Sequence, residues 1–163
     1  MALIGILSDT HAYLGEYIFR FFDDCDEIWH AGDIGSIEVL AALQNFKPTR
    51  AVWGNIDGAI IKKEIPAIQL FKYQGINVFM KHIVGYPNKY EKGIISVLQS
   101  TPLDLVIAGH SHILRILHDN KYNFLYINPG AAGIYGFHTK ITLVKLQIED
   151  GKIKDAFIWE KNK

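Results

Sequence analysis

The stretch that decides the fold is Ile4-Gly5-Ile6-Leu7-Ser8-Asp9-Thr10-His11, an apolar run that stops at an acid and a histidine. Asp9 and His11 are two positions apart, so on an extended exit from a strand their side chains can point the same way. A carboxylate oxygen and an imidazole nitrogen that converge at a strand end form half of a metal site. A turn and helix cap followed by a surface histidine is the alternative, and the other polar clusters decide between the two.

Strands and helices alternate in the first third of the chain. Short apolar runs that end at turn signals predict strands, and apolar residues at helical spacing predict helices. The expected elements are a strand at 2–7, a helix at 17–22, a strand at 27–30, a helix between Ser36 and Pro48, and a strand at 49–53. This order implies parallel strands joined by right-handed crossovers.

The rest of the chain is mostly β. A hairpin signal at Gln74-Gly75 is followed by one helix and then by strands in pairs. The expected strands are 65–73, 76–81, 105–108, 113–117, 122–128, 140–148 and 152–159, with the helix at 90–99. No internal repeat or linker interrupts them. We expect an α/β fold, with residues 1–163 as one domain whose second half forms another sheet packed on the first.

Composition limits the classes of function. Lys plus Arg equals Asp plus Glu, 17 each, so the formal net charge is zero, which argues against a large footprint for nucleic acid or an acidic membrane. The single cysteine, Cys25, has no disulfide partner and lies among acids that disfavour its thiolate. No stretch is apolar enough to span a bilayer, and the first residues do not resemble a signal peptide. We therefore expect a cytoplasmic location without membrane contact.

Polar residues gather at the ends of the predicted strands. The crevice outside the carboxyl ends of the strands is where an open α/β sheet binds ligands, so these side chains could converge on one site. Glycine stands beside three of them, where it would let the backbone turn sharply. The seven candidates are Asp9, His11, Asp33, Asn55, His82, His110 and His112.

These residue types suit a pair of divalent metal ions. Such a pair needs a bridging carboxylate with nitrogen and oxygen ligands at each end, and it activates a water as hydroxide while neutralising the charge of a phosphate. Asp33 can bridge. The other ligands of one ion would be Asp9, His11 and one of the last two histidines. The other ligands of the second ion would be Asn55, His82 and the remaining histidine.

Five clusters carry a resemblance to a known family. Asp9-Thr10-His11, Gly32-Asp33, Gly54-Asn55, His82 and Gly109-His110-Ser111-His112, in this order and spacing, resemble the calcineurin-like metallophosphoesterases, and most closely their small single-domain phosphodiesterases from bacteria and archaea. Asn128-Pro129-Gly130 resembles a turn of the same family. The resemblance implies two mixed β-sheets packed as a sandwich and flanked by helices.

The resemblance also implies roles for the seven residues. Asp9, His11, Asp33 and His112 would hold the first metal ion, and Asp33, Asn55, His82 and His110 the second. Asp33, Asn55 and His110 would act on the substrate, a small-molecule phosphoester. Manganese is the first choice for both ions, and iron, zinc or nickel also suit mixed oxygen and nitrogen ligands.

The chain departs from the family at two places. Many members have a histidine after the asparagine as the general acid for the leaving group, but this chain has Ile56, which cannot transfer a proton. Either the leaving oxygen is already stable as an anion or a metal-bound water supplies the proton, and we therefore expect faster cleavage of activated diesters than of alkyl monoesters. After His82 the family often has a glycine and another histidine, whereas this chain continues Ile83-Val84-Gly85.

Several residues keep two interpretations. His30 could orient a ligand or could simply pack at a strand end. Asp57 is interpreted as a turn or supporting acid, and His138 could approach the substrate from the loop after Asn128-Pro129-Gly130. For the whole chain, the alternative to a two-metal phosphodiesterase is a non-catalytic interaction scaffold of the same fold, like the subunit of the retromer coat. Nuclease activity fits a neutral chain poorly, and the apolar C-terminal hairpin offers an interface for a homo-oligomer.

Overall fold

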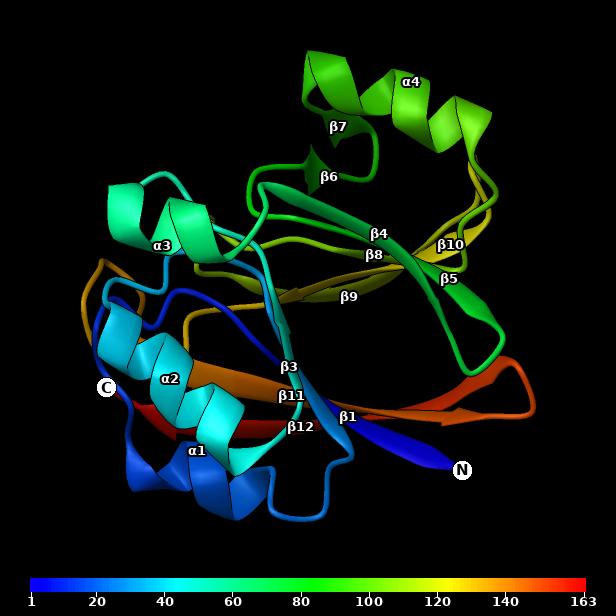
Figure 1. Cartoon of the computed structure of the whole chain (residues 1–163). Helices are drawn as coiled ribbons and strands as arrows, with labels where there is room; N and C mark the ends of the chain where they lie inside the picture. The colour runs from blue at the N-terminus through cyan, green and yellow to red at the C-terminus, as the bar shows by residue number, and fades with distance from the viewer.

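The computed structural model describes residues 1–163 and contains two five-stranded mixed sheets that face each other (Figure 1). The first sheet has the order β12-β11-β1-β2-β3. Its strands are β1 (Ala2–Leu7), β2 (Glu27–His30), β3 (Thr49–Ala51), β11 (Lys140–Glu149) and β12 (Lys152–Asn162). β1, β2 and β3 are parallel, and the last hairpin runs antiparallel beside β1.

The second sheet has the order β4-β5-β8-β10-β9. Its strands are β4 (Ile68–Tyr73), β5 (Ile76–Lys81), β8 (Leu105–Ile107), β9 (Leu114–Asp119) and β10 (Phe124–Pro129). β5, β8 and β10 are parallel to one another, and the two edge strands are antiparallel. A small hairpin, β6 (Gly85–Tyr86) and β7 (Lys89–Tyr90), follows β5. The predicted fold of two mixed sheets is confirmed.

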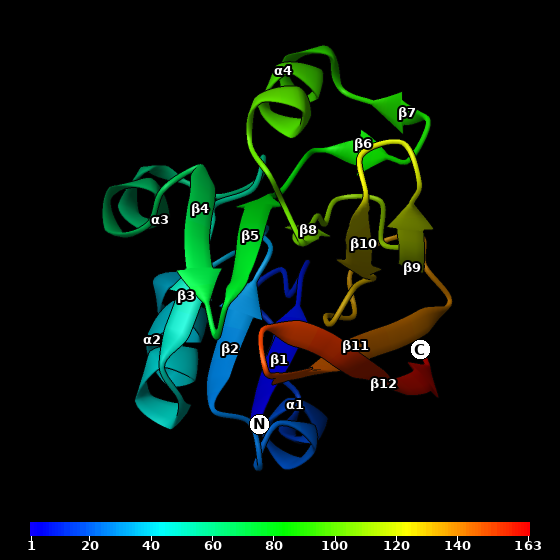
Figure 2. The same cartoon turned by 90° about the vertical axis from the view of Figure 1, so that its right-hand side faces the viewer.

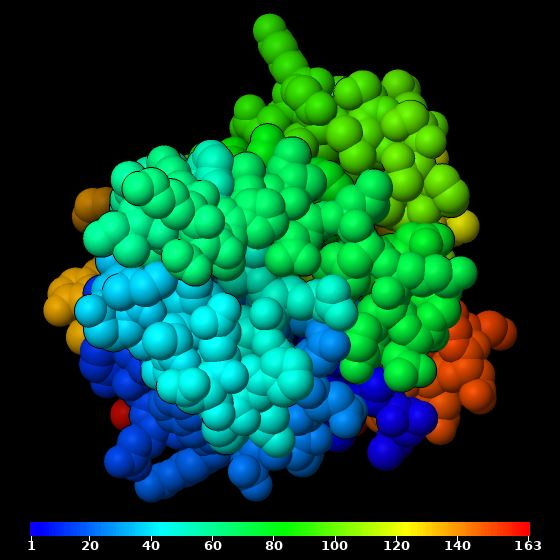
Figure 3. Space-filling model, in the orientation of Figure 1, coloured from blue at the N-terminus to red at the C-terminus, as the bar shows by residue number.

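Helices cover the outer faces of the sandwich. α1 (Glu16–Phe21) and α2 (Ile37–Phe46) pack on the first sheet, α3 (Ala59–Glu64) follows β3, and α4 (Lys92–Ser100) packs on the second sheet (Figures 1 and 2). Ser36 caps α2 by accepting a hydrogen bond from the Val39 amide, as the sequence predicts. Figure 3 shows α2 and α3 side by side on one face, with the α4 segment above them. None of the four helices has the length and apolar character that a membrane crossing requires.

An apolar layer between the two sheets holds the strand ends in place. Ile4 and Ile6 of β1 meet Val78 and Met80 of β5 and Ile107 of β8 in this layer, and all five side chains are fully buried. Burying each such side chain stabilises the fold by about 1.5–3 kcal/mol. Because the layer fixes one sheet against the other, the carboxyl ends of β1, β2 and β3 lie at the same edge of the sandwich as those of β5 and β8.

The prediction that the whole second half forms the other sheet is wrong for the C-terminal hairpin. β11 pairs antiparallel with β1, from Ala2 opposite Ile148 to Ile6 opposite Val144, so the hairpin belongs to the first sheet. The physical reason is the free edge of β1. β2 covers only one side of that buried strand, and the backbone groups on its other side need partners, which β11 supplies.

Shorter features also differ from the prediction. α3 and the β6–β7 hairpin were not expected, because α3 spans six residues and buries only Ile61, which leaves no periodic pattern to detect. The strand expected at 49–53 ends at Ala51, and the helix expected at 90–99 begins at Lys92. None of these differences displaces a candidate ligand from its strand end.

Candidate metal centre

The backbone that leaves β1 is left-handed at three residues, Asp9, His11 and Ala12, and not extended as expected. Asp9 has φ 55° and His11 has φ 47°, and their amides donate to the carbonyl oxygens of Gly32 and Asp33. Asp33, His110 and His112 are left-handed as well. Non-glycine residues in this region cost of order 1 kcal/mol each and persist only where the surroundings impose them, a pattern that is concentrated at functional sites.

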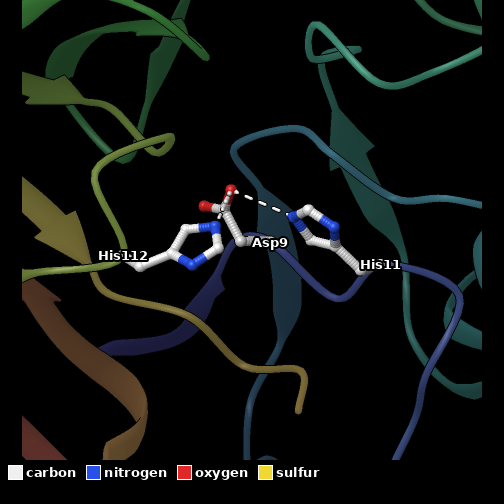
Figure 4. A group of neighbouring side chains, drawn as sticks. All are labelled: Asp9, His11 and His112. Carbon is white, nitrogen blue, oxygen red and sulfur yellow. Dashed lines mark ion pairs between the residues drawn. The ribbon is translucent and has the colours of Figure 1, made fainter. Parts of the chain in front are cut away.

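The first ligand group surrounds the carboxylate of Asp9. Its Oδ1 lies 3.1 Å from Nε2 of His112 and 3.6 Å from Nε2 of His11, while its Oδ2 accepts a hydrogen bond from the His110 amide. Figure 4 shows the rings of His11 and His112 on either side of this carboxylate. Asp9 is fully buried, and both rings are partly buried. These three residues can present one carboxylate oxygen and two imidazole nitrogens to one ion.

The second ligand group surrounds Asp33 and Asn55. Nε2 of His82 lies 3.2 Å from Oδ2 of Asp33 and 3.0 Å from Oδ1 of Asn55. The same Asn55 oxygen lies 3.0 Å from Nδ1 of His110. Asp33, His82 and His110 also form a group with ligand atoms close enough for one ion. His82, for which the sequence departs from the family pattern, is buried inside this group.

Asp33 joins the two groups. Its Oδ2 lies 3.5 Å from Nε2 of His11 in the first group and 3.2 Å from Nε2 of His82 in the second. Its Oδ1 accepts a hydrogen bond from the Ile56 amide, which fixes the carboxylate. The structure thus brings all seven predicted ligands together. The loops after β1, β2 and β3 supply Asp9, His11, Asp33 and Asn55, and those after β5 and β8 supply His82, His110 and His112.

The donor set fits a cation. Oδ1 of Asp9 and Nε2 of His11 are buried and have no hydrogen-bond partner, a state that costs about 1–3 kcal/mol for each atom. Nδ1 of His82 donates to the Ala31 carbonyl oxygen at 2.7 Å, so the lone pair of its neutral ring faces the oxygens of Asp33 and Asn55. Electron-rich atoms that converge in this way are stabilised by a positive charge among them.

The pKa shifts show the same preference for positive charge. Burial raises the pKa of Asp9, but its contacts with His11 and His112 outweigh burial and hold that pKa well below its usual range. Burial lowers the pKa of His82, but the carboxylates of Asp33 and Asp9 outweigh burial and raise it. The pKa of His11 is raised chiefly by its contact with Asp9. The carboxylates therefore attract a cation to this site, whether a proton or a metal ion.

A buried carboxylate supports the ligand loops from behind. Asp57 accepts hydrogen bonds from the amides of Gly54 at 2.8 Å, Gly35 at 2.8 Å and Ile34 at 3.1 Å, and it is 3% exposed. These amides belong to the loops after β2 and β3, which carry Asp33 and Asn55. Both oxygens of Asp57 are occupied in this way, which confirms its interpretation as a supporting acid.

Gly54 is required for close packing and not for a sharp turn. A Cβ atom at this position would overlap the Asp33 side chain, and the backbone of Gly54 has no positive φ. The glycine therefore lets the loop after β3 approach the shared carboxylate. On the other side of the site, Asn128 donates to the Gly109 carbonyl oxygen and accepts from the Gly130 amide. The Asn128-Pro129-Gly130 turn thereby holds the loop that carries His110 and His112.

His30 lies behind the exit from β1 and is fully buried. Its Nδ1 accepts a hydrogen bond from the Gly32 amide, so its Nε2 donates to Oγ1 of Thr10, whose hydroxyl donates to the Ile34 carbonyl oxygen. His30 thus contacts no candidate ligand directly; it is packed at the strand end and bonded to Thr10, which stands between Asp9 and His11. Burial lowers the pKa of His30 to about 4.

This neutral histidine predicts a loss of stability in acid. The folded pKa of about 4 lies below the unfolded value of 6.5, so the unfolded chain takes up a proton that the folded chain excludes. The contribution of neutral His30 to the free energy of unfolding is complete above pH ~6.5. It is lost as the pH falls toward ~4, and the total loss is about 3 kcal/mol. We expect His30→Gln to reduce this loss in urea unfolding of metal-free protein. An identical pH dependence in the two proteins would contradict the prediction.

The position of His138 relative to the site cannot be predicted from the sequence alone. It contacts His112, with 3.2 Å between the two Nδ1 atoms, and it also lines the cavity beside His110 and His112. The available signal is weak: His138 follows the buried strand β10, but nine residues after the strand ends.

Comparisons with known proteins place the chain in a family. The model of the calcineurin-like phosphoesterase superfamily domain matches residues 2–151. A protein of Methanothermobacter thermautotrophicus described as a probable metallophosphoesterase is 31% identical, with 96% of this chain and 91% of the relative covered. The solution structure of Thermotoga maritima protein TM1076 shares the fold with TM-score 0.72 and 19% identity, covering all of both chains. Entamoeba histolytica Vps29 complexed with zinc has TM-score 0.74 and 14% identity, covering 98% of each chain. The chain belongs to the calcineurin-like phosphoesterase superfamily.

Proposed function

We propose that the chain is a metal-dependent phosphodiesterase that hydrolyses a small or activated phosphodiester. The observation that supports this function best is the Asp33 carboxylate, which lies between two groups of oxygen and nitrogen donors. Two divalent ions held there would lower the pKa of a water molecule and neutralise charge on the phosphoryl oxygens. Manganese is our first choice, with iron, zinc and nickel as alternatives for the same donors.

The role of each residue in the site follows from its burial. The buried and partly buried residues of the site would hold the ions: Asp9, His11, Asp33, His82 and His112. Asn55 and His110 are exposed at its outer side and lie 3.0 Å apart, so they would orient the oxygens of an incoming phosphoester. The short hydrogen bonds that tie these loops together keep the donors in place before a substrate arrives.

The surroundings of the site support a substrate with an apolar or aromatic leaving group. A cavity of about 690 Å³ adjoins His110 and His112. Its lining is mixed, with Ile113 and Phe137 among the apolar residues and Lys140 and Glu160 among the charged ones. Phe137 is fully exposed, and Ile56 is 47% exposed beside Asn55. Hydrocarbon side chains cannot donate a proton, which favours a substrate whose leaving oxygen is already stable as an anion.

This reasoning predicts a strong dependence on the leaving group. We expect efficient hydrolysis of aryl phosphodiesters and slow hydrolysis of alkyl phosphomonoesters with the same ions. Ile56→His would place a proton donor next to Asn55 and should raise the rates on alkyl esters by about 10²-fold, because general acid catalysis contributes at least that much. Rates on aryl esters should change little.

The measurement is a panel of phosphomonoesters and phosphodiesters, assayed with manganese, iron, zinc and nickel in turn. Ile56→Ala serves as the matched control, since it changes the size of the side chain without adding a proton donor. Equal rates on aryl and alkyl substrates in the unmodified protein would contradict the proposed role of Ile56. Robust cleavage of single-stranded DNA at physiological salt would instead favour a nuclease.

A non-catalytic scaffold is the second candidate. Several apolar residues near the site are exposed, with Ile113 at 52%, Tyr135 at 60% and Phe137 fully exposed, and exposed apolar surface of this kind can contact another protein. The two candidates are separated by metal analysis combined with turnover of an aryl phosphodiester. Two bound ions with turnover support the enzyme, and ions without turnover on any ester support the scaffold.

A further inference from the structure

A chain of three polar groups leads from the backbone to the first ligand group. Nε2 of His138 lies 2.9 Å from the Gly133 carbonyl oxygen, which can only accept, so this nitrogen carries a hydrogen and donates. In the neutral ring, Nδ1 of His138 is then an acceptor. It lies 3.2 Å from Nδ1 of His112, which must supply the hydrogen of that contact.

The contact with His138 favours one tautomer of His112, in competition with the Asp9 carboxylate on the other side of the ring. With its hydrogen on Nδ1, the Nε2 atom of the neutral ring carries the lone pair, and Nε2 is the atom that lies 3.1 Å from Oδ1 of Asp9. The opposite tautomer would turn two Nδ1 lone pairs toward each other and leave the contact with His138 without a hydrogen. The two rings are nearly perpendicular, with centroids 5.0 Å apart, which suits an in-plane N–H···N bond.

The loop at 133–138 is built around this contact. The Gly133 amide donates to the Asp9 carbonyl oxygen, which fixes the start of the loop at the exit from β1. Gly136 has φ +129°, and a Cβ atom there would lie 2.5 Å from Nδ1 of His112 and 3.0 Å from Nδ1 of His138. Nζ of Lys163 donates to the Gly136 carbonyl oxygen at 2.6 Å, so the end of the chain fastens the loop.

We propose that His138 is a positioning residue that sets the tautomer and ring orientation of His112, so that Nε2 of His112 faces the first metal position. This proposal rests on the proposed function at one point, because both assume that His112 is a metal ligand. Partners that orient metal-bound histidines typically change metal affinity by about 10–100-fold when they are removed. His138 is partly buried and touches neither Asp9 nor the second ligand group, so its effect should be confined to the first ion.

The test uses two variants of the full chain. His138→Phe keeps a ring and removes both polar atoms, while His138→Gln keeps one acceptor and one donor. Long-range proton–nitrogen NMR of the metal-free protein, at a pH where the rings are neutral, distinguishes the tautomers of His112. We expect the hydrogen on Nδ1 in the unmodified protein and in His138→Gln, and a mixture in His138→Phe. His118→Ala removes an exposed histidine elsewhere and serves as the control.

Calorimetric titration with manganese or zinc gives the second readout. We expect one of two binding events to weaken about 10–100-fold in His138→Phe and to recover at least in part in His138→Gln. An unchanged tautomer and unchanged affinity in His138→Phe would overturn the proposal. If the tautomer changes but the unmodified protein binds no metal, the positioning role stands and the proposed function fails. If His138→Phe does not fold, the unmodified protein alone provides the test. A hydrogen on Nε2 of His112 in that protein would overturn the proposal.

Discussion

Replacing Asp33 by alanine is expected to reduce turnover by about 10³-fold or more and to lower the metal content of the purified protein. Asp33 is the one carboxylate within 3.5 Å of histidine nitrogens in both ligand groups, so its loss removes a donor from each. A loss of 10³-fold corresponds to about 4 kcal/mol of transition-state stabilisation, which is the scale of charge stabilisation by a bound metal ion. Turnover of an aryl phosphodiester and elemental analysis measure the two effects.

Asp33→Asn is the matched control for this prediction. The amide keeps the size of the side chain and an oxygen that can accept the hydrogen bond from the Ile56 amide, but it lacks the negative charge. We expect it to retain more metal than Asp33→Ala and still to lose most turnover. A thermal melt of each metal-free variant checks that the fold persists. Full turnover by Asp33→Ala would show that the shared carboxylate has no part in the reaction.

The second large effect is expected on stability. Replacing Asp57 by alanine should lower the free energy of unfolding by about 4 kcal/mol, because the amides of Ile34, Gly35 and Gly54 lose their acceptor together. Urea unfolding in the presence of a chelator measures this change without a contribution from metal binding. The loops after β2 and β3 should also loosen, so metal affinity should fall with stability.

Two control variants separate the hydrogen bonds of Asp57 from its charge. Asp57→Asn retains one accepting oxygen and should lose about half as much stability. Asp23→Ala removes an exposed acid and should have little effect, since surface substitutions usually change stability by less than about 0.5 kcal/mol. If Asp57→Ala unfolds at the same urea concentration as Asp23→Ala, the hydrogen bonds of Asp57 do not support the site as described.

The positions of the candidate ligands could be predicted from the sequence because each one follows an apolar run. The burial of β1, β2, β5 and β8 requires such runs, and a polar residue directly after a run must lie at a strand end. Parallel pairing then brings the carboxyl ends to one edge. This reasoning needs no knowledge of the order of strands in each sheet, which explains why the placement of the C-terminal hairpin could be wrong without an error in the site.

Other features depend on contacts that no local pattern encodes. The alternation of β11 would suit either sheet, and only the free edge of β1 selects the first. The left-handed backbone at Asp9 and His11 is imposed by hydrogen bonds to Gly32 and Asp33, whereas local preference favours an extended exit. The contact between His112 and His138 joins residues 26 positions apart, with β9 and β10 between them and His138 in the loop that follows β10.

The division of the seven ligands between two sheets has a mechanical consequence. A shift of one sheet over the other by about an ångström would separate Asp33 from His82 and Asp9 from His112, and misplacements of that size are costly for metal sites. Side chains such as Met80 and Ile107, which are remote from the reaction, therefore set its geometry through their volume. Bound ions would in turn fasten the two sheets to each other, and the metal concentration in solution would determine how readily the sandwich opens.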